Sequence, residues 1–206
     1  MNKNMMLQII SLCVVITLPF CQTYSPREQA ILDFSKGNIS GYEQYLVEIG
    51  QYTTSGKLYH EKYQGHLVGI ARMATEKFKL TVMKNSIGFY HDKKSKDSSK
   101  FYLGVDFIVQ PKEDFPYGAM VEHLLKKHLS DFLFITQSCQ SVFDEPDIAG
   151  SVIGMRWNDG AKGGMFNFWI EKKDAELFEK NRITLAELIE RNTITNASGQ
   201  IIRLRK

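Results

Sequence analysis

Two segments in the middle of the chain constrain its fold most. Residues 101–109 alternate between apolar and other side chains, which predicts a β-strand with one buried face. Residues 118–139 carry apolar side chains at three- and four-residue spacing, which predicts an amphipathic helix about 30 Å long. A helix of that length is long enough to cross a sheet. Together the two segments predict a domain in which a helix packs on a sheet.

Neighbouring segments add further strands. Residues 148–157 and 165–171 are joined by a glycine-rich loop and predict a hairpin. Alternation over 78–82 and a short apolar stretch over 86–91 predict two more strands. With residues 101–109, these two would form an antiparallel meander.

Short helices are expected near both ends of the mature chain. Capping boxes that begin at Ser25, Ser40 and Thr184 each predict the start of a helix. A further helix is predicted over about 173–180.

The overall expectation is a single α+β domain over residues 21–206. Its sheet would be mostly antiparallel, made of the meander and the hairpin, and packed against one long helix, with short N-terminal and C-terminal helices. Residues 58–74 are ambiguous, because two glycines argue against a long helix there, and residues 200–205 predict a last strand. A composition of 43% hydrophobic and 24% charged residues is that of a globular protein and excludes a disordered tail or a polytopic membrane protein.

Residues 1–20 predict a signal peptide. Lys3 is the only charged residue before Arg27, and a mostly apolar run follows it until Pro19 interrupts the run. This pattern is typical of a secretory signal, and the run is shorter than the roughly 20 apolar residues that span a membrane comfortably. The alternatives are a buried N-terminal helix and a signal that stays attached as an anchor.

The end of this segment, Leu18-Pro19-Phe20-Cys21, resembles the lipobox of bacterial lipoproteins, and is most similar to the looser version found in spirochaetes. Leu18 and Cys21 fit the pattern, whereas Phe20 stands where Gly, Ala or Ser is usual. The resemblance covers about 20 residues and implies that Cys21 is acylated and becomes the first residue of an anchored lipoprotein. Ordinary signal cleavage near residues 21–23 is the alternative.

The cysteines add a constraint on stability. Cys13 would leave with the signal and Cys21 would carry lipid, so that Cys139 would be alone. The exported domain would then depend on its core rather than on a disulfide. If Cys21 is not acylated, a bridge between Cys21 and Cys139 is the alternative.

The common catalytic and metal-binding patterns are missing from the sequence. His123 and His128 are five residues apart, about 140° around a helix, unlike the two histidines of HExxH. His60 and His66 lack partners at zinc-ligand spacing. There is no GxSxG motif, and the glycine-rich loop at 160–164 lacks the features of a Walker A motif. We therefore expect no catalytic residue, no metal and no cofactor.

Basic residues gather in one part of the chain. Residues 57–112 contain 11 Lys and Arg against 5 Asp and Glu, whereas residues 113–151 contain 2 against 7. The candidate contacts for an anionic lipid, an anionic glycan or an acidic partner protein are the lysines of one polar loop: Lys93, Lys94, Lys96 and Lys100. A solvated sheet face with lysines that protect its edge is the alternative.

Large side chains lie on both faces of the predicted hairpin. Phe166 and Trp169 point to opposite faces of one strand, and Trp157 ends the other. A hairpin that is apolar on both sides is either central in its sheet or covered by something else. Trp157, Phe166 and Trp169 are therefore candidate contacts for a ligand or partner.

These observations favour an exported bacterial envelope protein with a non-catalytic binding or assembly role, located at the outer membrane or in the periplasm. The expected partners are the membrane, through a lipid anchor on Cys21, and an envelope protein or an anionic glycan or lipid. Export makes nucleic acid an unsuitable partner. The alternatives are an exported hydrolase that uses His60 or His66 at the sheet edge, and a carrier that holds a small apolar ligand between the long helix and the sheet.

Overall fold

The computed structural model describes residues 24–47, 54–91, 99–158 and 163–204. The predicted signal peptide and Cys21 lie outside these residues.

The described residues contain one mixed sheet of six strands. The strands are β1 (Thr81–Val82), β2 (Gly88–His91), β3 (Phe101–Val109), β4 (Ile148–Trp157), β5 (Gly164–Glu171) and β6 (Thr193–Asn196). Their order is β1-β3-β4-β5-β6, and β2 pairs with the other end of β3, on the side where β1 also pairs. The pairing of β3 with β4 is parallel, and all the other pairings are antiparallel. The predicted α+β class and the β4–β5 hairpin are thus confirmed.

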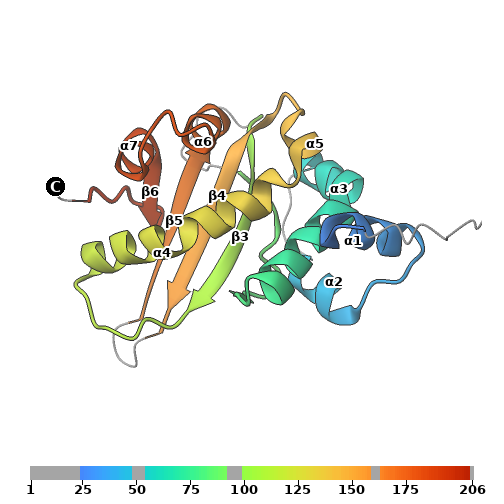
Figure 1. Ribbon diagram of the computed structural model, residues 1–206, viewed down its shortest axis with the longest axis horizontal. Coiled ribbons are helices and arrows are strands. Elements are labelled where there is room, and N and C mark those ends of the chain that lie inside the picture. The colour runs from blue at the N-terminus through green and yellow to red at the C-terminus, as the bar shows by residue number, and fades with distance from the viewer. Residues whose placement is uncertain (1–23, 48–53, 92–98, 159–162, 205–206) are drawn as a thin grey trace, which may run out of the picture.

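The long helix α4 (Tyr117–Gln137) connects the two parallel strands (Figure 1). Parallel neighbours need such a crossover, because the chain must return to the end of the sheet from which β3 started. One face of α4 is buried against the sheet through side chains that include Leu125, Leu129 and Phe132. The long helix expected over 118–139 is therefore present, and it crosses one face of the sheet.

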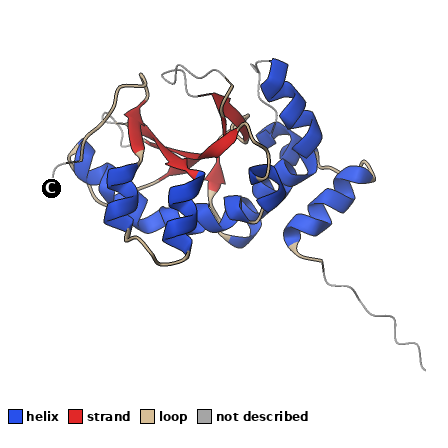
Figure 2. Cartoon of the chain, turned by 90° about the horizontal axis from the view of Figure 1, so that it is seen from above, coloured by secondary structure: helices blue, strands red, loops and turns tan. Residues whose placement is uncertain are grey.

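The remaining helices lie on the same side of the sheet as α4 or beside the β2 edge (Figure 2). They are α1 (Pro26–Ser35), α2 (Gly41–Val47), α3 (Thr54–Arg72), α5 (Gln140–Phe143), α6 (Lys172–Glu179) and α7 (Leu185–Arg191). A π-helical turn, Met73–Lys77, extends α3. The three predicted capping boxes form, since the side chains of Ser25, Ser40 and Thr184 accept from backbone N–H groups of their helices.

Residues 58–74, which were ambiguous in the sequence, form the helix α3 and its π-helical turn. The two glycines serve packing between helices: a Cβ on Gly65 would lie 3.2 Å from the Ile31 Cα, and one on Gly69 would lie 3.2 Å from the Arg27 Cγ. Missing side chains therefore allow α1 to approach α3 closely, a gain that outweighs the low helix propensity of glycine.

Three local predictions were wrong. The stretch 78–82 contributes only Thr81–Val82 to the sheet, because Lys79 adopts a positive φ of 54° just before it. The meander is absent, since β1 and β2 both pair with β3 and not with each other. At the C-terminal end, residues 200–205 supply one isolated bridge, from Ile201 to Thr195, and the strand forms earlier, at β6.

The two faces of the sheet differ in what covers them. The inner face packs against the helices and includes the fully buried Leu103, Phe107, Ile153, Phe166 and Phe168. The opposite face, which we call the open face, has no helix of the described residues packed on it (Figure 2). Side chains that point outward from the central strands are thus available for a role other than holding helices.

Candidate binding site on the open sheet face

The strand register arranges the open face in rows across the sheet. One row is Asp106 of β3, Gly154 of β4, Asn167 of β5 and Thr195 of β6, each hydrogen-bonded across to the strand that carries the next. Two residues further along lies the row Gly104, Val152, Trp169 and Thr193. Every second residue of a strand points to the same face, so these side chains share one surface.

Asp106 lies at the centre of this surface. Its Oδ1 is 2.0 Å from the position that a Cβ on Gly154 would occupy, and the Asn167 Oδ1 is 2.9 Å from the same position. The absence of a side chain at Gly154 therefore gives the Asp106 carboxylate its room. The glycine also brings the carboxylate and the Asn167 amide together above the backbone of β4.

The Asp106 carboxylate is buried, with 7% of the residue exposed. Its backbone is held by Ser86, whose hydroxyl accepts from the Asp106 N–H at 3.3 Å. Among the described residues, none donates a hydrogen bond to the carboxylate itself, and the charge that acts on it is the more distant Arg156. Burial raises the pKa of Asp106 to about 6, and the attraction of Arg156 lowers it only in part.

Aromatic side chains form the other half of the surface. The Tyr90 ring lies over Gly104, where its Cδ2 is 2.6 Å from the position of an added Cβ, and its hydroxyl donates to the Ser86 carbonyl at 2.5 Å. Tyr102 and Trp169 meet edge to face with ring centroids 5.2 Å apart.

Hydrogen bonds fix both of those rings. The Tyr102 hydroxyl donates to Glu171 at 2.7 Å, and the Trp169 indole donates to the Thr195 hydroxyl at 3.1 Å. The rings of the open face are therefore held in place before anything binds to them.

The three aromatic residues predicted as contacts separate in the structure. Trp169 lies on the open face and is partly exposed. Phe166 is fully buried on the inner face, and Trp157 is 4% exposed between Tyr117 and Phe166. Burial leaves Phe166 and Trp157 with almost no surface for a partner, because the hairpin is central in the sheet and α4 covers its inner side.

The predicted basic contacts lie at one end of β3. Lys100 is exposed immediately before β3 begins. Lys93, Lys94 and Lys96 lie outside the described residues. An anionic contact at this loop stays a prediction.

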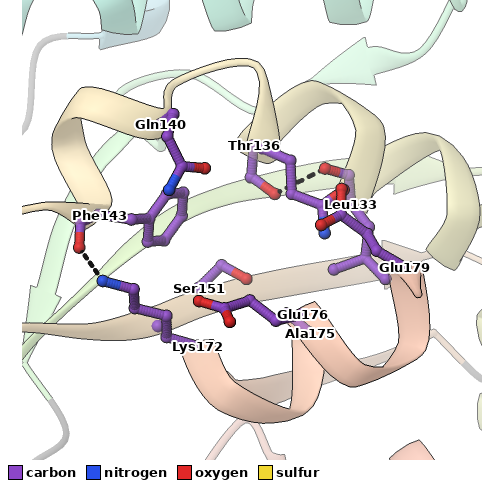
Figure 3. A pocket seen from close by; sticks show the side chains of 11 residues that line it. Leu133, Thr136, Gln140, Phe143, Ser151, Lys172, Ala175, Glu176 and Glu179 are labelled. Atoms are coloured by element: carbon purple, nitrogen blue, oxygen red, sulfur yellow. Dashed lines mark hydrogen bonds between the residues drawn. The ribbon is translucent and has the colours of Figure 1, made fainter. Parts of the chain in front are cut away.

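A small cavity lies between α4, α5, α6 and β4 on the covered side of the sheet (Figure 3). Its volume is about 30 Å³, which matches one water molecule. Ser151 and Glu176 line it, and the Lys172 ammonium donates to the Phe143 carbonyl beside it. A carried apolar ligand has no room in this cavity.

A wider groove lies at the far end of the sheet. Its volume is about 780 Å³, and its walls come from α7, β6, the start of α4 and residues 201–204. Several walls are apolar, including Ile189 and the exposed Ile201. The groove has no buried polar group of the kind that Asp106 supplies on the open face.

The histidines and Cys139 do not form a reactive centre. The His66 Nε2 lies 3.1 Å from the Ser141 hydroxyl, and burial lowers the pKa of His66. Cys139 is fully buried, and burial raises its pKa to about 11, which disfavours the thiolate. In the described part of the chain, no three His, Cys, Asp or Glu side chains gather as metal ligands would.

Comparisons with family profiles, with curated proteins and with solved structures find no match to this chain. Among the described residues, no helix has the length and apolarity that crossing a membrane requires.

Sequence reasoning identified one residue of this surface, Trp169, and missed Asp106, Asn167, Tyr90 and Tyr102. A usable signal was present in β3, where Asp106 occupies an outward position of a strongly apolar strand and Gly104 stands two residues before it. A glycine beside a carboxylate on the same face indicates room for something to approach.

Proposed function

We propose that this chain is an exported envelope protein that acts by binding, through the open face of its sheet. The observation that supports this most is the unpaired polar centre of that face, Asp106, surrounded by fixed aromatic rings and left without a covering helix of the described residues. Residues that serve only the fold are paired or packed, whereas unsatisfied and partly exposed groups gather at functional sites.

The envelope location is proposed from the N-terminal sequence. The apolar run before Cys21 resembles a signal with a lipobox, so Cys21 would be acylated and hold the domain close to a membrane. Tyr24 is the first described residue and α1 begins at Pro26, so only a few residues separate Cys21 from the folded domain.

The intact mass of the protein purified from its native membrane fraction tests the location. A chain that begins at Cys21 and carries acyl chains supports the proposal. An unmodified chain that begins at or after residue 22 contradicts the anchor and leaves an exported protein without it.

Chemical-shift mapping tests the binding surface. The ¹⁵N-labelled protein, with Cys21→Ser to prevent lipidation, is titrated with neutral tetrasaccharides and with phosphatidylglycerol vesicles. The proposal expects the largest shifts at the Trp169 indole and at backbone amides of β3 to β5. Shifts confined to the α7 groove, or none with either probe, would contradict the open face as the binding surface.

The matched control is a pair of tryptophan variants. Trp169→Phe changes a ring on the open face, whereas Trp157→Phe changes one that is buried on the inner face. We expect only the first to weaken binding.

A further inference from the structure

The Asp106 carboxylate needs hydrogen-bond donors that the described residues do not supply. It is 93% buried by its exposed fraction of 7%, and no described residue donates to it. An ionised carboxylate accepts at both oxygens and is costly to bury without donors. Burial also raises the pKa of this group to about 6, which shows that the site disfavours the charge as it stands.

Asn167 extends the same polar centre. Its amide lies beside the Asp106 carboxylate above Gly154 and has no other hydrogen-bond partner in the described chain. Rotation of the amide lets Asn167 either donate to Asp106 or present its oxygen to a ligand. In both arrangements, lone pairs of Asp106 remain without a donor.

Donors from outside could be hydroxyl groups or a cation. Arg156 lies on the same face of β4, two residues from Gly154, and its charge opposes the approach of a second cation. An anionic ligand would meet the Asp106 carboxylate. A neutral ligand with several hydroxyl groups satisfies the carboxylate without either repulsion.

The aromatic row complements such a ligand. Trp169 is two residues from Asn167 on the same strand, so its ring begins about 7 Å from the polar centre, the span of one sugar ring. The Trp169 and Tyr90 rings offer apolar surface, and the C–H face of a pyranose packs on such a surface while its hydroxyls point away. Polar centre and aromatic ring together match the two sides of a saccharide.

We propose that Asp106 and Asn167 form a subsite for the hydroxyl groups of a neutral saccharide, with Trp169 as the stacking ring beside it. This inference rests on the proposed function and names the ligand class for the same face.

The test measures binding of three soluble probes, the tetramers of N-acetylglucosamine, of β-1,4-linked glucose and of α-1,4-linked glucose, by isothermal titration calorimetry at pH 7.5. Spermidine is the cationic probe, and phosphatidylglycerol vesicles are the anionic one. We expect at least one tetrasaccharide to bind, and both Asp106→Ala and Trp169→Ala to weaken it tenfold or more. Asp144→Asn, a change at an exposed carboxylate beyond α5, is the matched control and should leave the affinity unchanged.

Each other outcome separates the inference from the proposed function. If Trp169→Ala abolishes saccharide binding and Asp106→Ala does not, the subsite is wrong and the binding face stands. If spermidine binds in an Asp106-dependent way and no saccharide binds, the ligand class is wrong. If none of the probes binds the native protein, the saccharide subsite is overturned, and vesicle binding alone that maps to the open face would leave the proposed function intact. Circular dichroism of each variant confirms that it is folded before binding is compared.

Discussion

At the scale of single residues, Asp106 is the feature of this protein that stability alone explains least. A carboxylate buried without donors destabilises the folded state whenever it is ionised. Its usual pKa is 3.8, and burial raises the pKa to about 6 in the fold. The stability that the protonated form supplies is therefore complete below about pH 4 and is lost as the pH rises to about 6.

We expect Asp106→Asn to be more stable than the native protein above pH 6, by up to about 3 kcal/mol, because about two pKa units of penalty are removed. Below pH 4 the two proteins should converge. Urea unfolding at pH 4, 5, 6 and 7 measures this difference. Parallel curves across the whole range would show that the Asp106 carboxylate is not destabilising in the fold.

Gly154 provides a second prediction at this scale. An added methyl group would lie 2.0 Å from the Asp106 Oδ1, so Gly154→Ala should cost about 1–3 kcal/mol of stability through overpacking. In an Asp106→Ala background the carboxylate is gone, and most of that cost should vanish. A double-mutant cycle of unfolding free energies measures the coupling. Additive losses would mean that Gly154 is required for a reason other than Asp106.

At the scale of elements, Arg72 joins three helices at the edge of the domain. From the end of α3, its guanidinium donates to Asp33 of α1 at 2.7 Å and to Glu43 of α2 through both Nε and Nη2. The side chains of Arg72 and Glu43 are 13% and 11% exposed, so this pairing is largely shielded from water.

Arg72→Met should therefore lower the free energy of unfolding by about 3 kcal/mol, because it leaves two carboxylates without their partner. Arg72→Lys should recover little, since a single ammonium cannot reproduce the paired donors of the guanidinium. The comparison variant is Lys62→Met, whose partner is Glu145 and whose side chain is 59% exposed, and here we expect a loss below about 1 kcal/mol. Chemical denaturation of the three variants measures these values. Equal losses for Arg72→Met and Lys62→Met would contradict the shielding argument.

At the scale of the whole molecule, one continuous core joins all the elements. The buried cluster runs from Ala30 of α1 through the inner face of the sheet and α4 to Ile194 of β6. The helix α4 also ties the halves of the sheet together, because it links the adjacent strands β3 and β4 across the long way round.

We expect residues 22–206 to unfold in one cooperative transition, with the Cys139 thiol protected until then. Cys139 is fully buried with its pKa raised to about 11, so a thiol reagent should react with it at the rate of unfolding. Calorimetry and thiol labelling across the same temperature range make the measurement. Labelling well below the transition, or two separate transitions, would show that part of the domain opens on its own.

The elements that were predicted correctly are those whose pattern repeats over many residues. The strand at 101–109, the helix at 118–139 and the hairpin each bury a periodic apolar face, and periodicity is a property of the chain alone. Short elements were harder. β6 is four mostly polar residues long, and its place is decided by pairing with β5 rather than by its own side chains.

The sequence by itself determined the helices that begin with capping boxes, the strand and helix at the centre of the core, and the N-terminal segment from which export is proposed. Each of these depends on neighbours within a few residues. The tertiary structure alone decided that β3 and β4 are parallel, that Gly65 and Gly69 are packing positions within a helix, and that Trp169 faces outward while Trp157 and Phe166 are buried. It also placed Asp106 beside Asn167, 61 positions later in the chain. Cross-strand register sets these relations, and register results from how the whole chain packs, so no local pattern carries it.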